Sequence, residues 1–381
     1  MHRRVRQPRA DWPAQLDRVG VTYHSLDGGY WREDVAYELS ETQVDDLASA
    51  TSSLHRLCVE AVERIIREDR FADLHIPEQW RARIIDSYER QEPSLYGRFD
   101  FWYDGIGSPK LLEYNADTPT SLLEAAVGQW GWLRETCPEA DQFNSLHERL
   151  IGQWRAIRRR ASNDLLHLAC LDGSDEDRQT VTYLADTANQ AGWRVQTLPI
   201  EQIGWEPERR RFVDHRNEPI SALFKLYPWE WMCQDAFAAE LPRSSMMVLE
   251  PAWKQVLSHK GLLALLWEWY PDHPNLLPAF LSGPGDCAAY VKKPFWSREG
   301  ANISIVNGDQ VLTTAGPYDA QLSVYQQYMP LPVFEGWHPV IGSWVVGDEP
   351  AGMGIREDRE LIHGNQSRFV PHFVVKDVLN T

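Results

Sequence analysis

The sequence predicts an α+β protein in which helices and antiparallel sheet share the core. Apolar residues recur at helical spacing through much of the first 160 residues. From Leu165 a strand–helix–strand pattern follows, and after Pro251 short β-rich segments alternate with Gly and Pro turns. We therefore expect a helical N-terminal region over residues 1–160, a βαβ unit over 161–250 and a mainly antiparallel region over 251–381.

Composition limits the class of protein. The chain has 381 residues, 43% of them hydrophobic, which is enough for a large core and more than one domain. Its net charge of −17 repels a phosphate backbone, so we expect no nucleic-acid partner. The longest apolar stretch, from Leu262 to Trp267, is too short to span a bilayer. We expect a cytoplasmic protein with no membrane partner, and the oligomeric state stays open.

Helical patterns dominate the N-terminal region. Ser40 and Gln43 have the spacing of a capping box, which predicts a helix start. The apolar face of this helix is expected to contain Val44, Leu47, Leu54, Leu57, Ala61, Val62 and Ile65. Another helix is expected to open near Pro77, and helical spacing returns over 121–133 and 141–160. We interpret these helices as structural.

The βαβ unit begins with the apolar run LLHLACL and continues through a helical stretch to the strands WRVQTLPI and SALFKLY. Its first loop, from Asp172 to Asp177, carries four acids and a single Gly. It therefore lacks the G-x-G-x-x-G pattern that holds a pyrophosphate, and we do not expect a dinucleotide-binding domain. Substrate specificity is expected to lie in the N-terminal region and in loops such as this one and 228–241.

Residues 97–120 interrupt the helical region and are predicted to form a β-hairpin, because Asp104-Gly105 and the following Gly-Ser-Pro mark a turn. Alternation predicts the faces Arg98/Asp100/Trp102 and Phe99/Phe101/Tyr103 on the first strand, and Leu111/Glu113/Asn115 and Leu112/Tyr114 on the second. Burial of the aromatic face then pairs Asp100 with Glu113, and Arg98 with Asn115.

Two facing carboxylates repel each other and need a compensating cation. Oxygen ligands from Asp100, Glu113 and Asn115 suit Mg²⁺, which could in turn hold a phosphate. The alternative is an amphipathic hairpin with a solvated polar face, which the E-x-N pattern alone favours. The three residues together with Arg98 and the polar loop 116–120 favour a metal site.

A strand over residues 289–294 carries Lys292 and Lys293, which must point to opposite faces. A strand lysine beside the loop 296–302 could hold phosphate, but alternation does not say which of the two faces a pocket. Two solvated lysines that protect a sheet edge are an equally good interpretation.

Lys260 is predicted to lie in the first turn of a helix capped by Ser258. A cation there opposes the helix dipole, which suggests a nearby anion. Lys254 is the rival candidate, and a solvated lysine is the ordinary alternative.

Arg356 ends the run AGMGI, whose small residues allow a ligand or backbone to approach closely. It could neutralise charge on a transferring phosphoryl group. A surface ion pair with Glu357, Asp358 or Glu360 is the alternative.

Several common catalytic motifs are missing from the sequence. There is no Walker A pattern, no G-x-S-x-G and no H-E-x-x-H. The five cysteines contain no C-x-x-C pair and are interpreted as reduced thiols. P-loop, hydrolase and zinc-dependent functions therefore lose support.

Five segments in order resemble the glutathionylspermidine synthase family of ATP-grasp ligases, from about Arg98 to the C-terminus. They are RFDFWYDGIGSPKLLEYNADTPTS, EPAWKQVLSHKGLLALLW, YVKKPFWSREGANI, VYQQYMPLPVFEGWHPVIGSWVVG and GIREDRELIHGNQSRFVPHF. The chain is most similar to short, stand-alone members described as acid–amine ligases, which lack the amidase domain of the bifunctional enzymes.

The resemblance implies an ATP-grasp fold in which 161–250 is the pre-ATP-grasp unit and 251–381 the nucleotide-binding region. It implies ATP and Mg²⁺ as cofactors, and a small-molecule or peptide acid and an amine as partners. ATP would phosphorylate the acid, and the amine would attack the acyl phosphate to give an amide, ADP and phosphate.

The matched motifs imply a role for each candidate residue. They assign magnesium to Asp100, Glu113 and Asn115, the reacting phosphate and carboxylate to Arg98, nucleotide phosphates to Lys260 and Lys293, the flap to Glu299 and Gly300, adenine to Tyr325, Gln326, Gln327 and Tyr328, the transition state to Arg356, and the acid to Thr118 and Thr120.

Two departures from the family pattern concern specificity. The flap, residues 295–300, is bulkier than a Gly-rich loop, and Thr118-Pro119-Thr120 replaces other small polar residues of the glutathione-using enzymes. The sequence therefore names neither the acid nor the amine. A catalytically silent ATP-grasp module that binds nucleotide or a peptide is the alternative function, and retention of every mapped charged residue favours the ligase.

Overall fold

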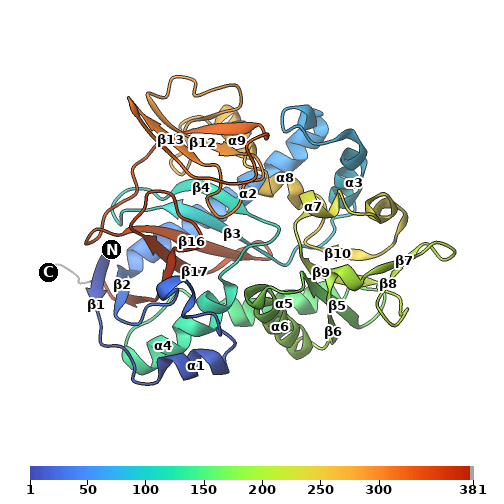
Figure 1. The fold of residues 1–381 in the computed structure, drawn as a ribbon, viewed down its shortest axis with the longest axis horizontal. Coiled ribbons are helices and arrows are strands. Elements are labelled where there is room, and N and C mark those ends of the chain that lie inside the picture. The colour runs from blue at the N-terminus through green and yellow to red at the C-terminus, as the bar shows by residue number, and fades with distance from the viewer. Residues whose placement is uncertain (378–381) are drawn as a thin grey trace.

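An antiparallel sheet at the centre of the molecule combines strands from distant parts of the chain (Figure 1). The computed structural model describes residues 1–377. The central sheet has the order β18-β17-β16-β3-β4, with β3 (Tyr96–Trp102), β4 (Lys110–Asn115), β16 (His338–Val346), β17 (Glu349–Asp358) and β18 (Arg368–Val370). The predicted hairpin therefore lies beside the C-terminal strands.

The βαβ unit predicted from Leu165 is confirmed. A parallel sheet has the order β10-β9-β5-β6, with β5 (Leu165–Cys170), β6 (Arg194–Pro199), β9 (Ala222–Leu226) and β10 (Met247–Leu249). Helix α6 (Asp175–Gln190) joins β5 to β6, and α5 (Leu146–Arg158) packs against α6. The backbone N–H of Asp177 donates to Ser174 Oγ at 3.2 Å and caps α6. The hairpin β7 (Gly204–Glu206) and β8 (Arg211–Val213) extends from this part.

A third sheet lies above the central sheet in Figure 1 and is antiparallel, as predicted for the C-terminal part. Its order is β11-β15-β12-β13-β14, with β11 (Ala279–Phe280), β12 (Ala289–Pro294), β13 (Ser304–Asn307), β14 (Gln310–Thr313) and β15 (Ser323–Gln327). The domain boundaries at residues 160 and 250 stay a prediction.

Helix α2 (Glu41–Arg67) forms as its sequence predicts. Ser40 and Gln43 make both hydrogen bonds of the capping box, and the predicted apolar face is buried except that Val44 is half-buried. Thr51 Oγ1 lies 2.7 Å from Ser343 Oγ, which ties the helix to β16 of the central sheet. The other long helices are α1 (Trp12–Arg18), α3 (Glu78–Glu89), α4 (Gln129–Thr136) and α9 (Leu262–Trp269).

Short helical segments complete the described chain. They are α7 (Trp229–Met232), α8 (Lys254–Ser258), η1 (Leu26–Gly28), η2 (Arg70–Ala72), the π-helical turn η3 (Glu124–Gly128), η4 (Ile200–Gln202) and η5 (Ala238–Arg243). The helix predicted from Ser258 is wrong in one respect: α8 ends at Ser258 and α9 starts at Leu262. Lys260 therefore lies in a break between two helices.

The N-terminal region contains strands that local periodicity did not predict. β1 (His2–Val5) and β2 (Val35–Ser40) form a sheet with β19 (His372–Val375), so the first and the last strand of the described chain lie on either side of β2 (Figure 1). β2 pairs with β1 on one side and with β19, more than 300 residues further along the chain, on the other. The pairing with β19 cannot be recognised from the residues around β2.

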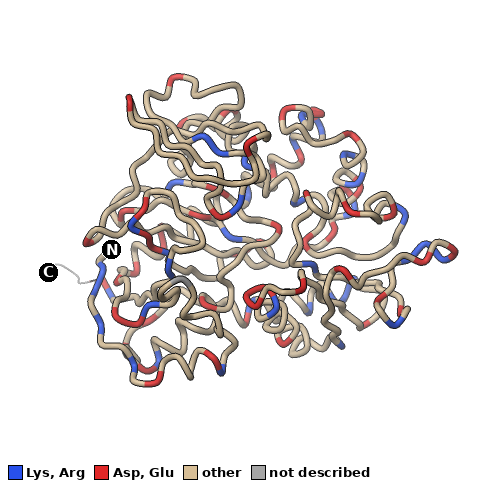
Figure 2. Tube along the Cα trace, in the orientation of Figure 1, with Lys and Arg blue, Asp and Glu red and all other residues tan. Residues whose placement is uncertain are grey.

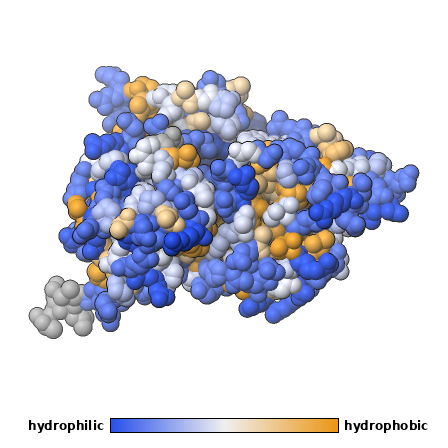
Figure 3. Space-filling model, turned by 60° about the horizontal axis from the view of Figure 1, so that its bottom comes forward, coloured by the Kyte–Doolittle hydropathy of each residue, from blue (hydrophilic) through white to orange (hydrophobic). Residues whose placement is uncertain are grey.

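Two hydrophobic clusters cover opposite faces of the central sheet. Phe99 and Phe101 point into one, whereas Tyr96 and Trp344 belong to the other. Figure 3 shows a mainly hydrophilic face, and Figure 2 shows acidic and basic residues interleaved along the chain. No helix within residues 1–377 combines the length and apolar character of a membrane span.

Candidate active site

A cavity of about 440 Å³ lies between the central sheet and the third sheet. Its walls come from the central sheet, the loop after β4, the break between α8 and α9, strands β12 and β15, and the flap. The predicted residues in the lining are Arg98, Asp100, Glu113, Asn115, Thr118, Thr120, Lys260, Lys293, Glu299, Gly300, Gln326, Gln327, Tyr328 and Arg356. Tyr325 is outside this lining, and its ring centroid lies 5.8 Å from that of Tyr290.

The hairpin has the predicted register at its polar end. Asp100 is the partner of Glu113, and Arg98 is the partner of Asn115. An irregularity after Asp100 then pairs Phe101 with Leu111 and leaves Leu112 without a partner in this ladder. The predicted faces of Leu111 and Leu112 are therefore wrong: Leu111 is buried in the core, and Leu112 lines the cavity.

Two arginines hold the Asp100 carboxylate. Arg98 donates to it from Nε at 2.6 Å and from Nη2 at 2.9 Å, and Arg356 Nη2 donates at 3.0 Å. Arg98 Nη1 also donates to the carbonyl oxygen of Thr120 at 2.5 Å. Asp100, the two arginines and the loop predicted to bind the acid substrate thus form one hydrogen-bonded network. Arg356 pairs with Asp100 and not with Glu357, Asp358 or Glu360, which were the alternative partners.

The Glu113 carboxylate is equally compensated. Lys260 Nζ lies 3.0 Å from Oε2, and the Asn115 side-chain amide donates to Oε1 at 3.0 Å. Burial alone would raise the pKa of Glu113, but the ammonium groups of Lys260 and Lys293 outweigh it and hold the pKa well below its usual range. Glu113 is therefore ionised at neutral pH.

These side chains fit a hard cation. Asp100 and Glu113 are ionisable oxygen donors held opposite each other, and Asn115 offers an amide oxygen beside them. Among residues 1–377 no group of three His, Cys, Asp or Glu side chains could hold a metal ion.

The two lysines of β12 separate as alternation requires. Lys293 is 8% exposed and donates from Nζ to Gln326 Oε1 at 2.7 Å and to the carbonyl oxygen of Leu112 at 2.9 Å. Burial lowers its pKa to about 8, although Glu113 acts in the opposite direction. Lys292 is exposed. Lys293 is therefore the one that faces the cavity.

Lys260 reaches the cavity from the helix break. Its Nζ donates to the carbonyl oxygen of Ser297 in the flap at 2.7 Å, besides its pair with Glu113. Lys254, the rival candidate, is buried elsewhere and binds Glu250 at 2.8 Å and the carbonyl oxygen of Tyr96 at 2.6 Å. The structure thus places Lys260, and not Lys254, in the cavity.

Arg298 in the flap was not among the predicted residues. It donates to Glu230 Oε1 from Nε at 3.1 Å and from Nη2 at 2.6 Å, and to Thr118 Oγ1 from Nη1 at 2.8 Å. The backbones of Glu299 and Gly300 then turn with φ of 54° and 69°. A charged residue inside an otherwise bulky flap was the available signal, but its partners lie far away in the sequence.

An acidic and phenolic wall was also missed. Tyr23, Tyr30, Ser121 and Glu176 line the cavity, and the Tyr30 hydroxyl donates to Glu124 Oε1 at 2.5 Å. Burial and the neighbouring Glu124 raise the pKa of Glu176 to about 8. The acidic loop noted from Asp172 contained the signal for Glu176, whereas the tyrosines stand in a segment with no periodic pattern.

Known proteins are similar to this chain over most of its length. A family model described as "Glutathionylspermidine synthase preATP-grasp" matches residues 3–375. A Haemophilus influenzae protein named as a candidate acid–amine ligase is 43% identical over 384 residues, which are 96% of this chain and 98% of that protein. The bifunctional glutathionylspermidine synthetase/amidase of Escherichia coli is 26% identical over 400 residues, which are 96% of this chain and 64% of that protein.

A solved structure shares the fold at low sequence identity. The glutathione synthetase like-effector from Globodera pallida superposes with a TM-score of 0.56 at 8% identity, covering 97% of this chain and 100% of that one. The mixed helix-and-sheet architecture is therefore glutathione synthetase-like.

Proposed function

The chain belongs to the glutathionylspermidine synthase family, and we propose that it is an ATP- and Mg²⁺-dependent ligase that joins a carboxylic acid to an amine through an acyl phosphate. The observation that carries the proposal is one cavity lined by two paired carboxylates and four compensating cations. Phosphoryl transfer requires such preorganised charge, because its reactants and intermediate are highly anionic.

We propose that the nucleotide lies between the two antiparallel sheets, as in an ATP-grasp fold. Lys260 and Lys293 would bind its phosphates, and Gln326, Gln327 and Tyr328 would receive the adenine. Asp100, Glu113 and Asn115 would hold Mg²⁺, which when bound supplies neutralisation of phosphate oxygen charge.

The acid would enter beside the loop that contains Thr118 and Thr120. An oxygen of its carboxylate attacks the γ-phosphorus, and the bond from that phosphorus to ADP breaks. Arg98 and Arg356 lie on either side of Asp100 and can neutralise the charge that moves during this step.

The amine would approach from the wall of Tyr23, Tyr30 and Glu176. The oxygen atoms of these side chains can accept hydrogen bonds from an amine. Because burial raises the pKa of Glu176 to about 8, its ionised form, whose fraction grows as the pH rises towards 8, can take the proton that the amine must lose. The amine lone pair then attacks the acyl carbon, and phosphate leaves with the electrons of the C–O bond.

The test compares Glu113→Gln with the matched surface variant Glu208→Gln, since Glu208 lies in the exposed turn between β7 and β8. With Mg²⁺ and a nonhydrolysable ATP analogue at a hundred times its Kd, native protein gains about 2.7 kcal/mol of stability. We expect the thermal midpoint to rise for wild type and Glu208→Gln, but not for Glu113→Gln.

If no variant responds, the nucleotide site is wrong. If wild type binds the analogue but never releases ADP from ATP with pooled acids and amines, the chain is a binding module and not a ligase.

A further inference from the structure

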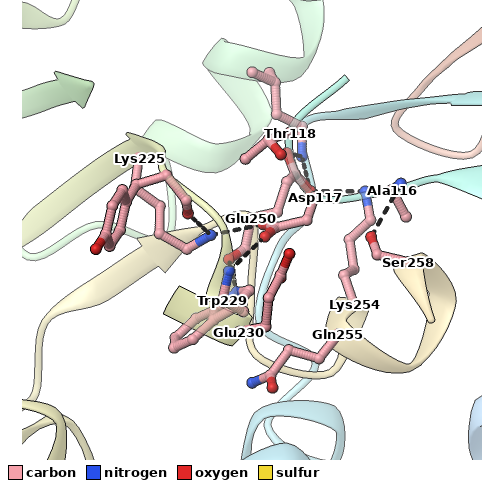
Figure 4. Close-up of polar contacts among 12 residues, drawn as sticks. Ala116, Asp117, Thr118, Lys225, Trp229, Glu230, Glu250, Lys254, Gln255 and Ser258 are labelled. Carbon is pink, nitrogen blue, oxygen red and sulfur yellow. Dashed lines mark hydrogen bonds and ion pairs between the residues drawn. The ribbon is translucent and has the colours of Figure 1, made fainter. Parts of the chain in front are cut away.

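A buried ion pair stands behind the cavity. Asp117, in the loop after β4, is 1% exposed, and Lys225, near the end of β9, is 0% exposed. Lys225 Nζ lies 2.6 Å from Asp117 Oδ1, and the backbone N–H of Trp229 donates to Oδ2 at 2.9 Å (Figure 4). Neither Asp117 nor Lys225 is among the residues that line the cavity.

The chain neighbours of this pair are the two partners of the flap arginine. Thr118 directly follows Asp117, and Glu230 directly follows Trp229. Both accept hydrogen bonds from Arg298, at 2.8 Å and 2.6 Å respectively. Figure 4 shows Asp117 on the loop that also carries Thr118, with its side chain directed towards Lys225 and Trp229. One carboxylate therefore anchors both segments that receive Arg298.

Stability alone does not account for such a pair. Removing two charges from water costs several kcal/mol, and apolar residues of similar size are often as stable at such a place. Lys225 Nζ also donates to the carbonyl oxygen of Tyr227 at 2.9 Å, and lies 4.7 Å from the centre of the Trp229 ring. The pair thus fixes the path of the backbone from β9 into α7, which a nonpolar contact would not do with the same directionality.

We propose that Asp117 and Lys225 are positioning residues that dock the flap. They hold Thr118 and Glu230 at the spacing that Arg298 bridges, and so keep the flap over the cavity. The consequence for the acid substrate rests on the proposed function, whereas docking of the flap does not.

The experiment is limited trypsin digestion without nucleotide, read by mass spectrometry at the Arg298–Glu299 bond. Docked Arg298 is protected, because its guanidinium is bound to Glu230 and Thr118. In Asp117→Leu/Lys225→Met both charges disappear together, so no unpaired charge remains buried. We expect cleavage there to accelerate by about tenfold or more, while cleavage at Arg209 and Arg210 in the exposed β7–β8 turn keeps its rate.

Two single variants test the contact itself. Glu230→Ala should also release the flap, whereas Glu240→Ala, which removes a surface partner of Arg243, should not. Release by Glu230→Ala without release in the double variant would overturn the positioning role. Equal acceleration at every site in the double variant would show general loosening and would also overturn it.

A milder variant covers a double variant that does not fold. Asp117→Asn keeps the shape but weakens the pair, and cleavage after Arg298 should again accelerate; an unchanged rate contradicts the proposal. Because digestion requires no nucleotide, absence of the Mg²⁺–ATP analogue response in wild type would refute the proposed function and leave the docking result standing.

Discussion

At the scale of single residues, each of the two carboxylates proposed to bind Mg²⁺ forms ion pairs with cationic side chains of the cavity. Asp100 binds Arg98 and Arg356, and Glu113 binds Lys260. A nucleotide with its metal can exchange these partners without exposing an isolated buried charge, which would be costly. This pairing explains how Asp100 and Glu113 can stand beside Arg98, Arg356 and Lys260 in one cavity.

Glu176 is predicted to make the stability of the protein depend on pH. Its folded pKa of about 8 is above the unfolded value near 4.3, so the folded state binds the extra proton between these values. Stability is therefore lost as the pH rises through this window. We expect Glu176→Gln, which cannot ionise, to raise the thermal midpoint by on the order of 1–4 °C at pH 9 and by much less at pH 5.

Thermal melts of both proteins across this pH range measure the difference. Glu201→Gln is the control, because Glu201 is exposed in a neighbouring turn and should show no such pH dependence. An advantage of Glu176→Gln that is equal at pH 5 and pH 9 would contradict ionisation as its cause.

At the scale of elements, a strand and a helix break deliver the two lysines. Alternation along β12 separates Lys293 from Lys292, and the interruption between α8 and α9 lets Lys260 contact the flap. A continuous helix would have carried Lys260 on its surface instead. Two residues of the flap are therefore held by side chains from outside it: Ser297 by Lys260, and Arg298 by Glu230 and Thr118.

Lys293→Met and Lys292→Met form a matched pair on one strand. Lys293 faces the cavity and Lys292 faces solvent. We expect Lys293→Met to weaken binding of the Mg²⁺–ATP analogue by about tenfold to a hundredfold, the effect of losing a charged hydrogen bond of 1.5–3 kcal/mol. Lys292→Met should bind as wild type does, by calorimetric titration. Equal losses in the two variants would refute the orientation.

At the scale of the whole molecule, the central sheet makes distant segments depend on one another. β3 pairs with β16, so residues near 98 and near 344 share a ladder that also presents the site. Trp344 is 1% exposed and stacks on Tyr96 with ring centroids 5.9 Å apart. Loss of packing at Trp344 should therefore destabilise both β3 and β16.

Trp344→Ala tests this coupling. We expect it to cost about 3–5 kcal/mol of unfolding free energy, the usual effect of emptying a buried aromatic site. Trp130→Ala, at a tryptophan that is 43% exposed, should cost far less. Denaturant unfolding followed by circular dichroism and by fluorescence measures both. If Trp344→Ala lowers the unfolding free energy no more than Trp130→Ala does, packing on the central sheet does not contribute to stability as predicted.

Local patterns determined a good part of this protein. The capping box at Ser40, the βαβ unit and the pairing of Asp100 with Glu113 follow from spacing within a few residues, because helix caps, strand alternation and tight turns are short-range interactions. Of the residues that the family motifs named, all except Tyr325 line the cavity.

Only the tertiary structure decided which side chains meet there. Arg298 joins Thr118 and Glu230, whose positions are 180 and 68 residues away, and the cavity face of β12 depends on the neighbour of that strand. The irregularity that exchanges Leu111 with Leu112 similarly arises from pairing between strands. Such contacts are set by how sheets pack, and packing energy is shared among residues that the sequence keeps far apart.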